Sequence, residues 1–170
     1  MRSALFLFAA LADTDMRWMA ANGQMRTYAP GDTLIRRNEQ LNGLLIVLTG
    51  SAAVDIAGRT LVRRAGECLG EMSLVDTRPA SVSVTATEPA RALWLDGAVL
   101  RRRFDAESGF AARCYRGLAI LLANRLREAT EGSDAGDDTL TLDETMLDGL
   151  ARAGERFRLL LSYVDVEAPG

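Results

Sequence analysis

Short apolar runs alternate with turn residues through the middle of the chain. The runs fall at residues 44–48, 53–56, 61–62, 82–84 and 92–95, and turns that contain glycine, such as 29–32 and 49–50, separate them. Short strands about ten residues apart, joined by glycine turns, are typical of an antiparallel barrel or jelly roll. The pattern therefore predicts a mainly β fold.

Helical periodicity flanks these runs. A helical segment is expected up to about residue 22, with Asp13 or Thr14 as its N-cap and Gly23 at its end. Asp96 is the expected N-cap of a short helix through Phe104. Residues 107–130 then predict a long helix with one buried face. Its apolar positions are Phe110, Cys114, Leu118, Leu121, Leu122 and Leu126.

The remaining residues predict an acidic linker at 131–138 and an amphipathic helix within 139–170. The apolar side of this last helix carries Met146, Leu147, Leu150, Phe157, Leu160 and Leu161. This side either reports to a partner or packs back on the domain, and the sequence leaves both alternatives open. The expected organisation is one domain over residues 1–130, the linker, and the C-terminal helix.

Missing residue types exclude several kinds of active site. The 170 residues include no histidine, and all 20 basic residues are arginine. Nucleophilic sites that use histidine, histidine-rich metal sites and lysine Schiff bases are therefore excluded. Cys68 and Cys114 stand far apart and predict buried, reduced thiols. No catalytic residue, metal or cofactor is expected.

Charge and hydropathy set further limits. The net charge of −3 is unlike that of a protein that binds nucleic acid by neutralising phosphates. Arg101, Arg102 and Arg103 are interpreted as a solvated helix face. The apolar N-terminal stretch is too short to span a bilayer and is expected to pack on the domain as a helix. We expect a cytoplasmic protein with no membrane or nucleic-acid partner.

The stretch GEMSLVDTRPASVSV, residues 70–84, carries the main functional signal. The backbone N–H groups that follow Gly70 can form an anion-binding concavity. Glu71 can accept hydrogen bonds from a sugar hydroxyl, unless it is merely the acidic first residue of a helix. Ser81 and Ser83 share one strand face, and Val82 shares the other face with Val84.

Three motifs in order resemble the cyclic nucleotide-binding domain, which is shared by bacterial catabolite activators, kinase regulatory subunits and gated channels. They are YAPGDTLI at 28–35, LIVLTG at 45–50 and the stretch 70–84, which resembles the phosphate-binding cassette. The resemblance covers about residues 8–130. It implies an antiparallel β jelly roll with flanking helices and a long C-terminal helix. Residues 70–84 are called the cassette below.

The resemblance also implies specific ligand contacts. The family glutamate holds the ribose 2′-hydroxyl, and an arginine nine residues later pairs with the cyclic phosphate. Glu71 matches the glutamate, but the arginine position holds Ala80. Arg78 or a polar residue of the long helix is then the candidate anion partner, with Arg116 favoured among Arg113, Arg116, Asn124, Arg125 and Arg127. The predicted ligand-binding residues are Gly70, Glu71, Met72, Ser73, Arg78, Ala80, Ser81, Val82, Ser83 and Arg116.

Three interpretations of the cassette remain open at this point. It binds a cyclic dinucleotide such as c-di-GMP, it binds cAMP or cGMP through Glu71 and backbone donors, or it is vestigial and the domain is a ligand-free scaffold. The chain lacks a second recognition helix, so a DNA-binding activator is not expected. We expect a non-enzymatic regulatory sensor that signals as a homodimer, or to a partner protein, through residues 110–130 and 143–162.

Overall fold

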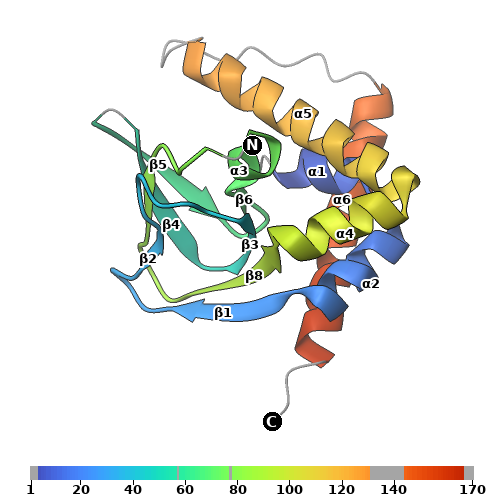
Figure 1. The fold of residues 1–170 in the computed structure, drawn as a ribbon, viewed down its shortest axis with the longest axis horizontal. Coiled ribbons are helices and arrows are strands. Elements are labelled where there is room, and N and C mark those ends of the chain that lie inside the picture. Colours follow the sequence, from blue (N-terminus) through green and yellow to red (C-terminus); the bar gives the residue numbers. More distant parts are fainter. Residues whose placement is uncertain (1–3, 57, 77, 131–143, 167–170) are drawn as a thin grey trace.

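Two four-stranded antiparallel sheets face each other and form a flattened barrel (Figure 1). The computed structural model describes residues 4–56, 58–76, 78–130 and 144–166. The first sheet has the order β1 (Gln24–Tyr28), β8 (Ala90–Asp96), β3 (Gly43–Thr49) and β6 (Cys68–Leu69). The second has the order β2 (Thr33–Ile35), β7 (Ser83–Ala86), β4 (Ser51–Ile56) and β5 (Arg59–Arg64). The predicted jelly-roll architecture is confirmed.

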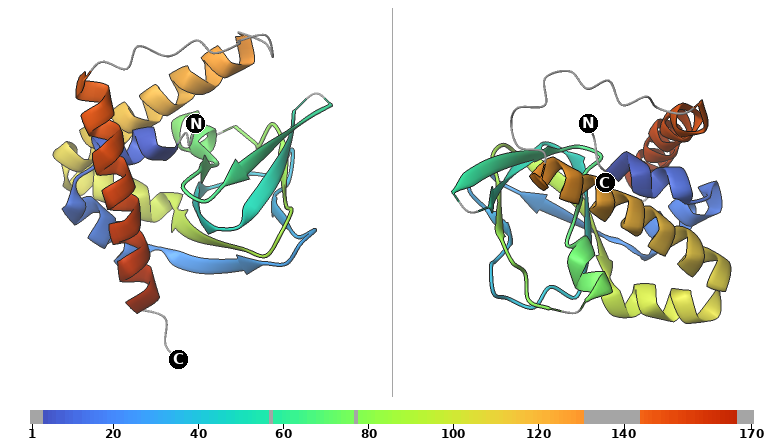
Figure 2. Two further views of the ribbon diagram at one scale, coloured as in Figure 1. Left: turned by 180° about the vertical axis from the view of Figure 1, so that it is seen from behind. Right: turned by 90° about the horizontal axis from the view of Figure 1, so that it is seen from above.

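Helices cover the outer face of the first sheet (Figure 2). They are α1 (Ala4–Ala10), α2 (Asp13–Asn22), α4 (Gly97–Ala106), α5 (Ser108–Thr130) and α6 (Glu144–Val166). A short helix, α3 (Glu71–Val75), connects β6 to the strand β7 of the second sheet. The molecule therefore has three layers: the helices, the first sheet and the second sheet.

The central strand β3 is apolar throughout because both of its faces are buried. Leu44 and Ile46 pack against the helices, whereas Leu45 and Val47 point into the barrel. Side chains alternate between the two faces of a strand, so an uninterrupted apolar run is expected for a strand buried on both sides. The first sheet thus separates a helical core from a second core inside the barrel.

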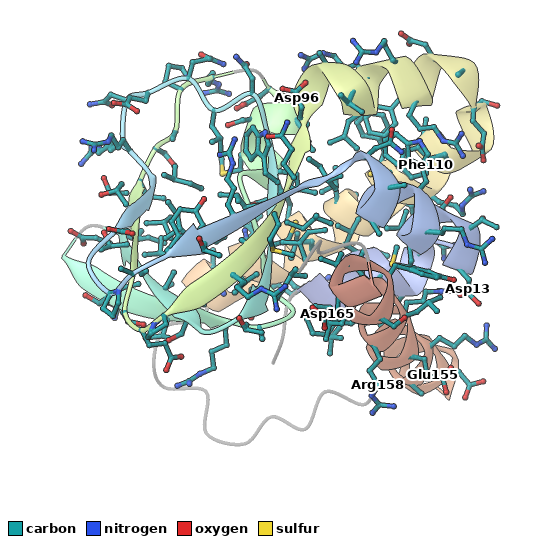
Figure 3. The ribbon with its side chains drawn as sticks, turned by 90° about the horizontal axis from the view of Figure 1, so that it is seen from below. Asp13, Asp96, Phe110, Glu155, Arg158 and Asp165 are labelled. Carbon is teal, nitrogen blue, oxygen red and sulfur yellow. The ribbon has the colours of Figure 1, made fainter. Side chains whose placement is uncertain are left out.

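Polar side chains define the ends of two helices. The Asp96 carboxylate accepts hydrogen bonds from the backbone N–H groups of Ala98 (2.8 Å) and Val99 (3.2 Å), which confirms its predicted capping role at α4. Figure 3 shows Asp96 at the start of this helix. At α2 the predicted N-cap, Asp13 or Thr14, is wrong, because the N-cap is Ala12, whose N–H donates to the side chain of Asp15 at 2.7 Å. An acidic side chain in the first turn reaches back to the residue that precedes the helix.

The C-terminal helix α6 packs on the domain, which answers one question that the sequence left open. Phe157 stacks on Phe8 of α1 with ring centroids 5.8 Å apart, and Leu160 is fully buried. Arg91 of β8 pairs with Asp165 at 3.1 Å, and Figure 3 shows Asp165 beside the barrel. The alternative in which this side reports to a partner required Phe157 to be exposed, but Phe157 is buried. The linker 131–138 and the side chains of Met146, Leu147 and Leu150 lie outside the described residues.

Several smaller expectations agree with the structure. Cys68 and Cys114 are free and buried, and burial raises the pKa of the Cys114 thiol to about 12. Arg101 and Arg102 are exposed, as predicted for a solvated face, but Arg103 is half-buried because it pairs with Glu107 and lies over the rings of Trp18 and Phe110. Of the helices in the described ranges, none is both long and apolar enough to cross a membrane.

Candidate ligand-binding site

The cassette begins with a turn that only glycine adopts readily. Gly70 has φ of +82°, in the left-handed region, where a side chain would be strained. An added Cβ would also meet the side chain of Leu41 and lie 2.9 Å from the carbonyl oxygen of Gly43. This turn directs the chain from β6 into α3 and places Glu71 at the first position of the helix. The Glu71 side chain faces inward and the residue is only 4% exposed.

The buried Glu71 carboxylate is paired with an arginine from α5. Nη1 of Arg125 contacts Oε1 of Glu71, and Nη2 donates to the carbonyl oxygen of Cys68 at 2.5 Å. The same Nη2 lies 3.8 Å from Oε2 of Glu67. Burial alone would lower the pKa of Arg125, but the charge and hydrogen bond of Glu71 raise it overall. The group that the family uses to hold a sugar is thus joined to the long helix.

Ala80 occupies the position at which the resemblance implies a phosphate arginine. Its N–H donates to the carbonyl oxygen of Glu39 at 2.9 Å, and its own carbonyl oxygen accepts the N–H of Asn38 at 2.8 Å. The Ala80 side chain packs with Val82 against the apolar interior of the barrel. An anion at this position would find no guanidinium on residue 80, and the amide of Ala80 is already bonded to the turn after β2.

The other polar residues of the cassette have different surroundings. The Ser83 hydroxyl accepts the backbone N–H of Arg37 at 3.1 Å, and Ser83 is half-buried in β7. Ser81 faces solvent. Ser73 is buried in α3, whereas Met72 on the same helix is exposed. The structure therefore brings Ser73 and Glu71 into the interior and leaves Ser81 and Met72 outside.

The arginine that reaches the cassette is neither of the two that the sequence favoured. The Arg78 side chain is 82% exposed and its Nε lies 2.9 Å from Oδ2 of Asp76. Arg116 is exposed on α5. Arg125, one of five candidates on this helix, makes the contact. A signal for it exists in the sequence, because Arg125 continues the buried stripe of α5 four residues beyond Leu121.

The barrel interior beside the cassette is apolar, and Trp94 is the one aromatic residue among the described buried side chains of this core. The guanidinium carbon of Arg26 lies 4.3 Å from the ring centroid of Trp94. A Cβ on Gly43 would lie 2.5 Å from the Trp94 ring, so the indole covers this glycine closely. The buried interior is lined by Leu34, Ile35, Leu45, Val47, Ala52, Val54, Leu69, Val84, Ala86, Ala92 and Trp94.

The hollow that the structure does show lies away from the cassette. A hollow of about 440 Å³ lies between α2 and α6, lined by Asp13, Arg152, Glu155, Arg156 and Leu159. This hollow is on the helical side of the first sheet. Within the described residues, no group of three or more Cys, Asp and Glu side chains is placed to hold a metal ion.

The fold and the cassette together define a small β-roll domain of the ligand-sensing type. Residues 25–107 match the family model of the cyclic nucleotide-binding domain. The chain therefore carries a domain of the cyclic nucleotide-binding family, and the matched range includes the whole cassette. Comparison with curated proteins returned no match.

Solved structures show the same fold. The catabolite activator protein of Thermus thermophilus is 25% identical, with a TM-score of 0.64, over 97% of this chain and 90% of that chain. The N-terminal domain of a transcriptional regulator from Streptomyces coelicolor is 28% identical, with a TM-score of 0.60, over 77% and 96% of the two chains. A cyclic nucleotide-binding domain from Methylobacillus flagellatus, 24% identical over 71% of each chain, matches in fold with a TM-score of 0.65.

Proposed function

We propose that this protein is a non-enzymatic regulatory sensor whose barrel binds a nucleotide second messenger at the cassette. The observation that carries the proposal is the ion pair between Glu71 and Arg125. It joins the carboxylate that would hold a ligand hydroxyl to α5, the long helix on the surface of the domain. A ligand that takes Glu71 must displace this contact. Binding at the cassette would then change how α5 is held.

The exposed Arg78 supports a ligand that carries its anionic group toward the mouth of the barrel. Arg78 is 82% exposed in its pair with Asp76, and pairs at the protein surface contribute only about 0–1 kcal/mol. The guanidinium is therefore free to turn toward a phosphate at little cost. A cyclic dinucleotide, which has two phosphates, suits this arrangement better than a mononucleotide whose single phosphate would sit against Ala80. The classes to test are c-di-GMP, cAMP and cGMP.

A ligand-free scaffold with a vestigial pocket is the second candidate, and a specific observation favours it. The N–H and the carbonyl of Ala80 are both bonded to the turn at Asn38 and Glu39. Glu71 is also already paired. If these contacts are permanent, the cassette has become part of the core and the domain acts through its surface alone.

A thermal-unfolding panel separates the two candidates. A ligand at about 100 times its dissociation constant stabilises by about 2.7 kcal/mol, which is about 5–10 °C for a chain of this size. We expect a shift of this order with one nucleotide class near 1 mM. The shift should vanish in Glu71→Gln and persist in Glu155→Gln, which makes the same change on the outer face of α6 (Figure 3). No shift with any nucleotide would exclude the sensor and favour the scaffold.

The outer face of α5 supports a homodimer as the signalling form. Tyr115 is 45% exposed and Leu126 is 65% exposed. Between them lie the exposed Ala119 and the half-buried Leu122. Spacings of four, three and four residues place these side chains on one stripe, the pattern by which two helices pack along their length. A second copy of α5 is the occupant that we propose for this stripe.

Leu126→Glu should abolish the dimer. The wild-type chain is expected at twice its mass of 18.4 kDa in sedimentation equilibrium, and the variant at the monomer mass, because the new carboxylates would face each other in an apolar contact. Leu61→Glu is the matched control, since Leu61 is an exposed leucine on the strand β5 and not on the stripe of α5. A monomeric wild-type chain, or a dimer that withstands Leu126→Glu, would contradict the proposal.

A further inference from the structure

The buried stripe of α5 carries an arginine at each end. Arg113 lies near the start of the helix and Arg125 twelve residues later, which is about 18 Å along the axis. Each arginine pairs with a carboxylate of a different element, Asp15 on α2 and Glu71 on α3. Both acids are buried, with Asp15 completely inaccessible to solvent. Two anchors therefore hold one helix at opposite ends.

The Asp15 anchor is a network rather than a single pair. Nε and Nη2 of Arg113 donate to Oδ2 and Oδ1 of Asp15 at 2.8 and 2.9 Å. Nη2 also donates to Oε1 of Glu107 at 3.2 Å, and Arg103 contacts the other carboxylate oxygen of Glu107. Bidentate pairing fixes the orientation of the guanidinium as well as its position. The network fixes where α5 begins relative to α2 and α4.

The segment between the anchors leaves little room for adjustment. Gly117 lies against α1 so closely that a Cβ would be 2.9 Å from the Cα of Leu7. Cys114, Leu118 and Leu121 are buried in the helical core. Close-packed interiors transmit displacements because they cannot deform continuously. A shift of α5 at one anchor is therefore carried to the other.

We propose that α5 is a rigid connection between two buried carboxylates, so that the Asp15–Arg113 pair is a positioning element for the Glu71–Arg125 contact at the cassette. Neither acid tolerates loss of its arginine, because an unpaired buried carboxylate is strongly destabilising. The axis of α5 must satisfy both pairs together. The structural connection does not depend on the proposed function, but its role in signalling does. A ligand that binds Glu71 would change the strain at α2, and α6 packs on α2.

A double-mutant cycle on the ligand-free protein tests the connection. Unfolding constants are measured in urea for Arg113→Met, Arg125→Met and the double variant. Sites more than about 10 Å apart normally act independently, within about twofold in the unfolding constant. Multiplying the effects of the two single variants on the unfolding constant gives the value expected for independent sites. We expect the unfolding constant of the double variant to be at least fivefold smaller than that value. The reason is that a misplaced α5 has already weakened the second pair.

The matched control replaces Arg156, another partly buried arginine, which bonds to Asp13 and to the carbonyl oxygens of Phe8 and Ala9. Arg156→Met with Arg125→Met should give effects that multiply. If the Arg113 and Arg125 effects also multiply, the connection is refuted, whatever the nucleotide panel shows. Conversely, a failed nucleotide panel would leave a measured coupling intact.

If the double variant does not fold, hydrogen exchange of one backbone amide in the single variants tests the same connection. The N–H of Asp76 donates to Met72 at 2.9 Å at the end of α3. In Arg113→Met this amide should exchange at least tenfold faster than in Arg156→Met. Equal exchange in the two variants would overturn the proposal.

Discussion

Arg125→Met is expected to destabilise the domain by about 3–5 kcal/mol, the usual effect of removing one partner of a buried ion pair. Methionine keeps most of the apolar stem of the arginine, so the loss comes from the charge and its hydrogen bonds. The Glu71 carboxylate would remain buried without its closest cation, and the carbonyl of Cys68 would lose a donor. Urea unfolding followed by far-UV circular dichroism measures the change.

A double variant that removes the charges of both Glu71 and Arg125 is the companion to this prediction. Glu71→Gln combined with Arg125→Met removes both charges of the pair, while Glu67, the other acid near Arg125, keeps Arg63 at 3.8 Å. The double variant should recover at least half of the stability lost in Arg125→Met alone. Replacing both partners of a buried pair by neutral groups is often nearly neutral. A single variant that loses less than about 1 kcal/mol would show that the pair behaves like an exposed one. The Glu71–Arg125 contact could then not hold α5.

Asp15→Asn is expected to destabilise the domain by about 3 kcal/mol at neutral pH, and by much less in acid. Burial alone would raise the pKa of Asp15, but its bonds to Arg113 and the N–H of Ala12 lower it below the ordinary value of 3.8. The unfolded chain therefore binds the proton more readily than the folded protein does. The stabilisation is complete above about pH 4 to 5 and is lost as the pH falls through the lowered folded-state pKa.

The measurement is the unfolding free energy of wild type and Asp15→Asn between pH 7 and pH 2. The difference between the two proteins should shrink below pH 4, because only the wild type has this carboxylate to protonate. Asp13→Asn is the control, since Asp13 begins the same helix but its side chain is 74% exposed and pairs with Arg156 at 3.0 Å. A constant difference across the pH range would show that the loss in Asp15→Asn is not electrostatic.

The sequence predicted the architecture well because local patterns determine it. The continuous apolar run of β3 and the capping side chain of Asp96 each reflect the geometry of their own segment. The long helix was placed within one residue of its observed start at Ser108. Turn residues such as Gly70 likewise mark the point at which the backbone must adopt a positive φ. These features do not depend on what lies across the fold.

The site could be predicted only in part, because its central contact joins distant segments. Glu71 and Arg125 are 54 positions apart, and periodicity does not show which element the buried end of α5 meets. For the same reason the favoured Arg116 lies on the exposed face. The sequence showed that Ala80 replaces an arginine, but not that the backbone of Ala80 bonds to the turn at Asn38. The packing of the C-terminal helix was equally ambiguous, since an amphipathic pattern does not show which surface the apolar side contacts.

The position of α6 has a consequence for how the chain folds as it is synthesised. Phe8 stacks on Phe157, and Arg156 donates to the carbonyl oxygens of Phe8 and Ala9 at the end of α1. These contacts span about 150 residues, so α1 must wait for that length of chain to be synthesised before its face toward α6 is covered. Contacts of such high sequence separation slow folding and prolong the exposure of apolar surface. The side of α1 that meets α6 is thus exposed to solvent on the growing chain until α6 has been synthesised.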